Sequence, residues 1–171
     1  AVKKTNRPEP ELLEELLDVN QPSKVLELLK GVKNKDAQLR FLEGEALRQL
    51  GSFEEAIAAY AASLQICESA EGRMDALLAL AACYRTLGHS AAAYEMAQDS
   101  FNMAQELEMD DYLVRSMQEM GMALRAWGRL EEALEMLDAV LSYYQEQKDW
   151  AGMSFICWAK GAVFAARLTI V

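Results

Sequence analysis

Three arginines recur at one position relative to three glycines. Each stands three residues before its glycine: Arg48 before Gly51, Arg85 before Gly88 and Arg125 before Gly128. Because a guanidinium group presents a planar fork of N–H donors that matches a carboxylate, such a ladder could hold an acidic or C-terminal peptide. A basic residue in the last turn of a helix also complements its carbonyl end. Acids such as Glu45, Asp75 and Glu119 could pair with the arginines, so ligand binding and internal pairing both stay open.

Catalytic chemistry has no recognisable signature in this sequence. An enzyme needs a nucleophile, a base and a charge stabiliser that converge, and the single histidine, His89, follows a turn glycine without an evident partner. No glycine-rich phosphate loop, HExxH motif or zinc spacing is present. The acidic pairs Glu54-Glu55 and Glu131-Glu132 begin predicted helices, where negative charge favours the helix dipole. We predict that the protein is not an enzyme and needs no metal or cofactor.

Composition restricts the partners. The chain has 17 basic and 27 acidic residues and a net charge of −10, which repels phosphate backbones, so we expect no nucleic acid. No apolar stretch reaches the roughly 18 to 20 residues that span a membrane, and the N-terminus lacks the apolar core of a signal peptide. We therefore predict no membrane and a cytoplasmic location. The cysteines, Cys67, Cys83 and Cys157, are interpreted as small buried hydrophobic residues.

The turn glycines mark an internal repeat, because they are 37 and 40 residues apart. Small residues recur around them: Gly44, Ala81 and Gly121 seven residues before, and Ala56, Ala93 and Ala133 five residues after. Small side chains are needed where two helices cross closely. A glycine can take the left-handed conformation that ends a helix. Each repeat is therefore predicted to be a helix, a tight turn and a second helix.

The segment Gly44…Leu47…Gly51-Ser52-Phe53-Glu54-Glu55-Ala56…Tyr60…Ser63-Leu64 resembles the tetratricopeptide motif, and residues 128–134 resemble its turn. The resemblance covers about residues 37–148. It implies an all-α, right-handed α-solenoid of helix-turn-helix repeats. The long repeats are similar to the extended class of Pins-type spindle-orientation scaffolds and rapsyn, which implies scaffold work.

The predicted organisation has four parts. Residues 1–8 are expected to be a leader that is disordered or introduced by cloning, and residues 9–36 a degenerate helical hairpin whose second helix ends at Val32. The three repeats are predicted over 37–73, 74–113 and 114–148. Residues 149–171 are expected to form one further helix, as a partial fourth repeat or a cap.

The resemblance implies a concave groove, lined by the first helices, as the usual peptide site. Beside the three arginines, the groove residues predicted here are Phe41, Glu45, Leu78, Ala82, Arg115, Gln118 and Met122. In chaperone-binding members a Lys/Asn/Asn/Lys/Arg clamp grips a terminal carboxylate. The corresponding residues here are Phe41, Glu45, Ala79, Arg115 and Glu119, so we do not expect that clamp.

Two functions remain from the sequence. The leading hypothesis is a scaffold or adaptor that binds a partner peptide segment, with acidic and apolar side chains, in its groove. The alternative is an assembly element that self-associates through its C-terminal helix, where Phe155, Trp158 and Phe164 make the helix very apolar for a cap.

Overall fold

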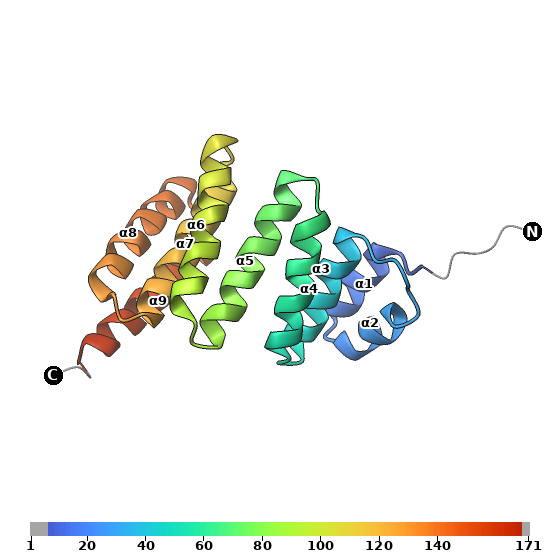
Figure 1. The fold of residues 1–171 in the computed structure, drawn as a ribbon. Coiled ribbons are helices and arrows are strands. Elements are labelled where there is room, and N and C mark those ends of the chain that lie inside the picture. Colours follow the sequence, from blue (N-terminus) through green and yellow to red (C-terminus); the bar gives the residue numbers. More distant parts are fainter. Residues whose placement is uncertain (1–6, 169–171) are drawn as a thin grey trace, which may run out of the picture. The chain divides into compact units, whose positions relative to one another are not determined.

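The computed structural model describes residues 7–168, which contain nine helices and no strand, as the all-α prediction requires (Figure 1). Residues 1–6 of the predicted leader lie outside this range. The helices are α1 Pro10–Asp18, α2 Pro22–Leu29, α3 Ala37–Gln49, α4 Phe53–Ile66, α5 Ala70–Thr86, α6 Ser90–Glu106, α7 Asp110–Ala126, α8 Leu130–Gln147 and α9 Trp150–Leu168. The chain divides into two compact units between Cys83 and Tyr84, within α5.

The turn glycines end their helices as the repeat predicts. Gly51, Gly88 and Gly128 have positive φ angles of 79°, 82° and 81°. After α3, the amide of Ser52 donates to the carbonyl of Leu47 at 2.9 Å, and the amide of Gly51 donates to that of Arg48 at 3.0 Å. These two bonds cap the carbonyl end of a helix, and they require a left-handed residue between helix and loop. The same pair of bonds recurs after α5 and α7.

The predicted close helix crossing lies between α3 and α4 in the first unit. A Cβ atom placed on Gly44 would stand 2.6 Å from the ring of Tyr60, so only hydrogen fits there. Tyr60 is fully buried against this gap. In the second unit, Gly121 of α7 has the same relation to Leu137 of α8, at 3.0 Å. The small residues before the turns are therefore contact points between paired helices.

The first unit begins with a core built by its three N-terminal helices. Their buried side chains form one cluster: Leu13, Leu17, Val25, Leu29, Leu39, Leu42 and Ala46. These positions lie on one side of each short helix, which a helix of only eight or nine residues needs in order to be stable. The second helix ends at Leu29, three residues before the predicted end at Val32.

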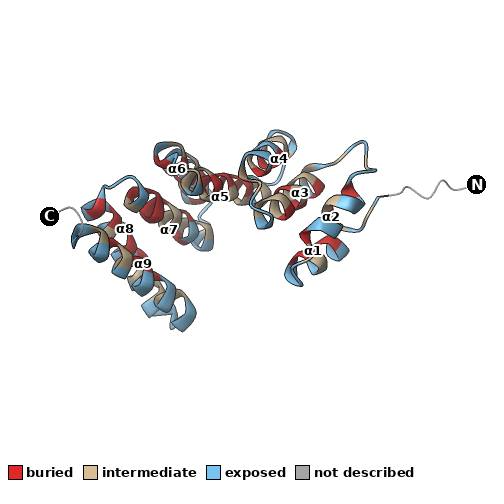
Figure 2. Cartoon of the chain, turned by 90° about the horizontal axis from the view of Figure 1, so that it is seen from below, coloured by how far each residue is buried: buried red, intermediate tan, exposed pale blue. Residues whose placement is uncertain are grey.

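The second unit is held together by a core shared by α7, α8 and α9. Its buried members are Val114, Met122, Leu124, Leu130, Ala133, Leu137, Val140, Ile156, Ala159 and Val163. Figure 2 shows buried segments of α7, α8 and α9 in red and exposed segments in pale blue. The further helix expected after residue 149 is therefore α9, which packs on α8.

Two repeats begin earlier than predicted. Helices α5 and α7 start at Ala70 and Asp110, whereas the sequence divisions were placed at 74 and 114. At α5 the side chain of Ser69 accepts a hydrogen bond from the amide of Gly72 at 3.2 Å. This bond satisfies one of the free amides of the first turn, so the helix begins directly after Ser69.

One prediction about cysteines was wrong. Cys83 is buried, but Cys67 is only partly buried and Cys157 is exposed. Cys157 lies on the side of α9 that faces away from α8, and a helix that is apolar all round gives no sequence signal of which side is covered.

The crossing of α3 and α4 makes a stability prediction. Gly44→Ala should lower the free energy of unfolding by about 1–3 kcal/mol, because its methyl group overpacks against the buried Tyr60 ring. Gly161→Ala in α9 is the control, since nothing lies within 4 Å of its Cβ position. That variant should gain about 0.5–1 kcal/mol from helix propensity. Urea denaturation followed by circular dichroism measures both, and an unchanged midpoint for Gly44→Ala would contradict the close crossing.

Candidate functional site

Helix α3 brings three of the predicted site residues together. Phe41, Glu45 and Arg48 are spaced four and three residues apart, which places them on one face of a helix. The Nη2 atom of Arg48 donates to Glu45 at 2.7 Å, and the ring of Phe41 lies 5.4 Å from that of Tyr60. The acid that could pair with the first arginine, Glu45, is therefore paired with it in the structure.

Tyr60 of α4, which is part of the repeat motif but not among the predicted site residues, also belongs to this cluster. Its hydroxyl donates to Oε1 of Glu45, so this carboxylate accepts from both a tyrosine and an arginine. Burial and the charge of Glu45 raise the pKa of Tyr60 well above its usual value. The hydrogen bond to Glu45 raises the pKa of Arg48, although burial opposes it. Glu45 is thus held in place by two donors.

The second unit contains Arg85 and Arg125. Arg85, at the end of α5, pairs with Glu119 of α7 at 3.4 Å, and about a fifth of each side chain is exposed. Burial raises the pKa of Glu119, while the charges of Arg85 and Arg115 lower it in part. Two of the three arginines therefore make the internal pairs that the sequence allowed.

In the second unit, not every hydrogen-bond donor of the arginine side chains has an acceptor in the part of the chain that the structure describes. The Nε atoms of Arg85 and Arg125 are both buried, and neither has a hydrogen-bond partner within the described residues. A buried donor without a partner costs free energy that a suitable acceptor would recover. Each of these two side chains therefore holds one buried donor whose hydrogen-bonding capacity no described residue uses.

The other predicted residues of α7 are divided between surface and core. The guanidinium of Arg115 stacks on the ring of Tyr112 at 4.7 Å, and Gln118 accepts a hydrogen bond from Tyr144 at 3.3 Å. Met122 is 4% exposed and belongs to the core of the second unit. Met122 therefore offers almost no surface to a partner.

The two predicted site residues of α5, Leu78 and Ala82, also differ in how far they are exposed. Leu78 is 6% exposed, whereas Ala82 is partly exposed. Burial removes Leu78 from the accessible wall, because a partner can contact only the exposed atoms of a side chain.

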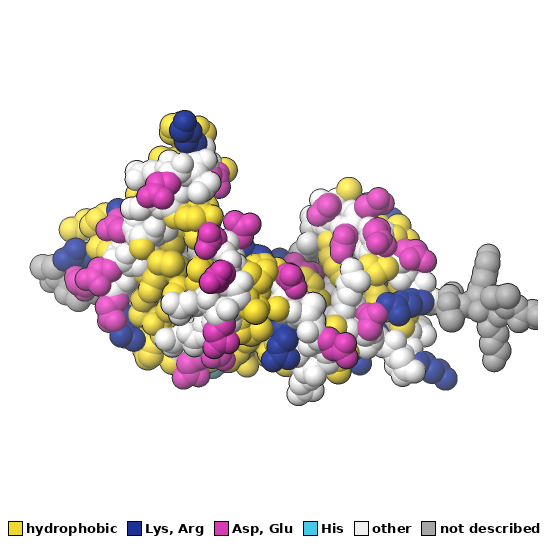
Figure 3. All heavy atoms as spheres, turned by 90° about the horizontal axis from the view of Figure 1, so that it is seen from above, with side chains coloured by type: hydrophobic (Ala, Val, Ile, Leu, Met, Phe, Trp, Pro, Cys, Tyr) yellow, Lys and Arg dark blue, Asp and Glu magenta, His cyan; other side chains and the backbone are white. Residues whose placement is uncertain are grey.

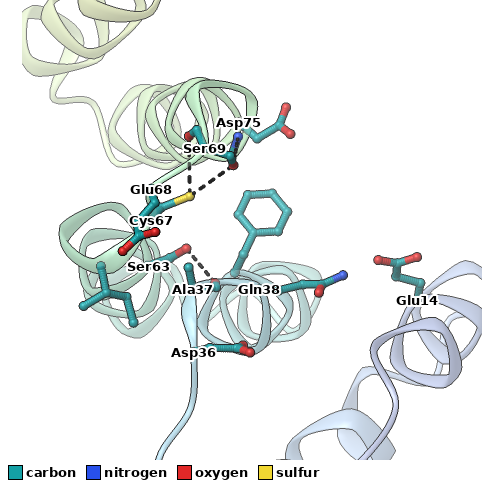
Figure 4. Close-up of a pocket in the computed structure, with 12 residues that line it drawn as sticks. Glu14, Asp36, Ala37, Gln38, Ser63, Cys67, Glu68, Ser69 and Asp75 are labelled. Carbon is teal, nitrogen blue, oxygen red and sulfur yellow. Dashed lines mark hydrogen bonds between the residues drawn. The ribbon is translucent and has the colours of Figure 1, made fainter.

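Sequence reasoning missed a pocket in the first unit. It has a volume of about 560 Å³ and lies beside α1 and α3, at the end of α4 and the start of α5 (Figure 4). Its lining residues are Glu14, Asp36, Ala37, Gln38, Phe41, Ser63, Ile66, Cys67, Glu68, Ser69, Gly72 and Asp75. Four of them are acidic and none is basic. The positions share no common spacing, so no repeat pattern could have grouped them.

Local hydrogen bonds shape this pocket. The hydroxyl of Ser63 donates to the carbonyl of Ala37 at 2.7 Å and joins the end of α4 to the start of α3. The Sγ atom of Cys67 lies 3.6 Å from both the carbonyl and the hydroxyl oxygens of Ser69. A Cβ atom on Gly72 would stand 2.6 Å from that sulfur, so a glycine is needed for this turn to close.

Metal clusters and membrane-spanning helices are not found among residues 7–168. No group of three or more His, Cys, Asp or Glu side chains among residues 7–168 could hold a metal ion. His89 is exposed beside its turn. None of the described helices is both long and apolar enough to cross a membrane. Acidic side chains are spread over the face shown in Figure 3.

Helical hairpins of about forty residues, each closed by a capping glycine and a small residue at its crossing, define a helical-repeat protein. Family comparison agrees: models described as tetratricopeptide repeat match residues 72–146 and 37–69. The chain belongs to the tetratricopeptide repeat family, and its fold is an all-α helical-repeat solenoid. Repeats of this family generally mediate protein–protein interactions and are typically not enzymes.

Solved structures share this fold. A variant of the tetratricopeptide-like repeats from a Podosopora anserina protein assigned as a kinesin light chain has a TM-score of 0.72 and 18% identity, covering 94% of this chain and 85% of that one. A second structure of those repeats has a TM-score of 0.65 and 18% identity, covering 92% and 94%. The MamA RS-1 ArsTM double mutant has a TM-score of 0.61 and 16% identity, covering 99% and 98%. No curated protein matches the sequence.

The ion pair of Arg85 and Glu119 makes a pH prediction. Arg85→Met should lower the free energy of unfolding by roughly 1–3 kcal/mol at pH 8, because it leaves a mostly buried carboxylate without its cation. Because burial holds the folded-state pKa of Glu119 above its unfolded value, the carboxylate takes up a proton as the pH falls toward that folded pKa. The destabilisation should therefore be smaller at pH 5 than at pH 8.

Urea denaturation at the two pH values measures this difference. Arg129→Met is the control, because its ion pair with Glu132 is exposed and its loss should show no such dependence on pH. An equal loss of stability at pH 5 and pH 8 for Arg85→Met would show that the pair does not govern the ionisation of Glu119.

Proposed function

We propose that the protein is a scaffold or adaptor that binds a segment of a partner protein on the exposed faces of its first helices. The family supports protein binding in general. The observation that carries the finer proposal is the pair of buried Nε donors of Arg85 and Arg125 in the second unit, which have no hydrogen-bond partner among the residues described. Since about a fifth of the Arg85 side chain is exposed and Arg125 is partly exposed, a carboxylate from a partner could bind the exposed part of these side chains.

The charges around these arginines fit an acidic side chain in the bound segment. Arg85, Arg115 and Arg125 place three positive charges in the second unit, and the carboxylate of Glu119 interacts with the charges of Arg85 and Arg115. A charge-assisted hydrogen bond to an arginine is about twice as strong as a neutral one. The arginines would therefore favour acidic over basic residues in the bound segment.

Binding of selected peptides tests this proposal. Twelve-residue peptides selected on the full chain from a random phage-displayed library should carry an acidic residue beside apolar ones. Arg125→Gln should weaken their binding roughly tenfold or more, measured by fluorescence anisotropy, because it removes a charged donor from the acceptor. The double variant Arg85→Gln/Glu119→Gln should do the same, and it removes both members of the ion pair together.

The matched control is Arg129→Gln, which removes an arginine that is exposed at a turn. Circular dichroism checks that every variant stays folded. Equal affinity of the selected peptides for the wild type and for Arg125→Gln would remove the arginines from the proposed site.

A second function, self-association through α9, is favoured by one observation. Trp150, Trp158, Phe164 and Leu168 are 73%, 61%, 49% and 80% exposed, all on the side opposite the buried residues of this helix. Both charged residues of α9 are tied to α8, Lys160 to Asp138 and Arg167 to Glu131. The exposed side of α9 is thus apolar and uncharged, which is typical of an interaction surface.

Analytical ultracentrifugation tests this second function. The sedimentation coefficient of the wild type should rise with concentration, and Trp158→Glu should abolish that rise because it places a charge within the apolar contact. Leu107→Glu is the control, since Leu107 is 50% exposed but lies at the end of α6. A wild-type chain that stays monomeric at all concentrations would contradict association through α9.

A further inference from the structure

We propose that the pocket of the first unit binds the side chain of a lysine or arginine carried by a partner protein. This inference rests on the proposed binding of a partner segment, but it concerns the other unit and the opposite charge. A lysine or arginine has an apolar stem and a cationic head, and it is best bound where apolar surface adjoins acceptors. The pocket of about 560 Å³ supplies both kinds of surface.

The apolar part of the pocket comes from two helices. Phe41 of α3 is partly buried and is fixed by its contact with the ring of Tyr60. Ile66, the last residue of α4, lines the same pocket although half of its surface is exposed. These two side chains offer a wall against which the methylene groups of a lysine or arginine could pack, and such packing would cover surface that is now in contact with water.

The acidic part comes from four places in the chain. Glu14 lies on α1, Asp36 precedes α3, Glu68 follows α4 and Asp75 lies on α5. Figure 4 shows the side chains of Glu14 and Gln38 pointing toward one another from α1 and α3. A carboxylate that lines a cavity can accept a hydrogen bond from a cationic head group, and such a charge-assisted bond is stronger than a neutral one. The same charges disfavour an acidic ligand.

The chain itself shows that this rim accepts a guanidinium group. Arg7 forms an ion pair with Asp36 at the edge of the pocket, and both side chains are about half exposed. Burial raises the pKa of Asp36, but the amide of Leu39 and the charge of Arg7 outweigh it, so the pKa lies below its ordinary value. Asp36 therefore carries its negative charge at neutral pH, and it binds the same chemical group that the proposal assigns to the partner.

Small-molecule titration followed by NMR tests the proposal directly. The probes are the N-acetyl N-methylamides of lysine and arginine, added to the ¹⁵N-labelled full chain, with those of norleucine and glutamate as controls. Lysine and arginine should produce saturable shifts at the amides of Phe41, Ser69 and Gly72, whereas norleucine and glutamate should bind several-fold more weakly. Equal binding of the norleucine and lysine probes would overturn the proposal.

Substitutions locate the effect in the pocket. Glu14→Gln/Glu68→Gln should weaken lysine binding roughly fivefold, as expected for the loss of two largely exposed carboxylates. Both side chains are exposed, so the variant should fold. Glu54→Gln/Glu55→Gln, which changes the net charge equally but lies in the first turn of α4, should leave lysine binding unchanged. Equal effects of the two double variants would overturn the proposal.

Two other outcomes are informative. If neither cationic probe binds, and Glu14→Gln/Glu68→Gln instead shifts the amide of Arg7, the pocket belongs to the chain's own Arg7 and the proposal is wrong. If the cationic probes fail while library peptides still depend on Arg125, the lysine or arginine pocket is refuted and the scaffold function stands. If the probes bind but Arg125→Gln has no effect on peptides, the arginine site fails and the pocket stands.

Discussion

The close crossing of paired helices is the constraint on which the rest of the first unit depends. Because Gly44 has no side chain, the ring of Tyr60 fits against α3 and is completely buried. That position brings the hydroxyl of Tyr60 to Glu45, and Glu45 in turn holds Arg48. Core packing therefore determines where the polar groups on the outer face of α3 point. A substitution of Gly44 would accordingly move the side chains of Glu45 and Arg48.

The predicted arginines have two structural roles. Each of the three predicted arginines lies in the last turn of its helix, where a positive charge complements the carbonyl end. Arg85 additionally stabilises the carboxylate of Glu119. Arg85 uses its terminal nitrogen for this pair, while its buried Nε has no acceptor among the described residues.

The sequence predicted those features that depend on local geometry. The turn after α3 requires a glycine at position 51, and the close crossing of α3 and α4 requires one at position 44. Both requirements recur at a fixed spacing in the sequence, so the repeat pattern reveals them. The pocket was missed because residues such as Glu14 and Asp75 line one cavity only after α1, α3, α4 and α5 have packed, and no spacing in the sequence encodes that arrangement. Met122 was assigned to the surface because the alignment fixed its position along α7 but not the depth of its side chain. Burial depends on the neighbouring helix, which sequence periodicity does not place.

The junctions between hairpins differ from the turns within them. After α6 and α8 the left-handed positions are filled by Glu108 and Lys148, with φ angles of 55° and 57°, and not by glycine. A residue with a Cβ atom pays roughly 1 kcal/mol for this conformation. Replacing Glu108 or Lys148 by glycine or asparagine should therefore raise the free energy of unfolding slightly. In an engineered version of this protein, these two sites could be used to raise thermal tolerance without altering any surface proposed to meet a partner.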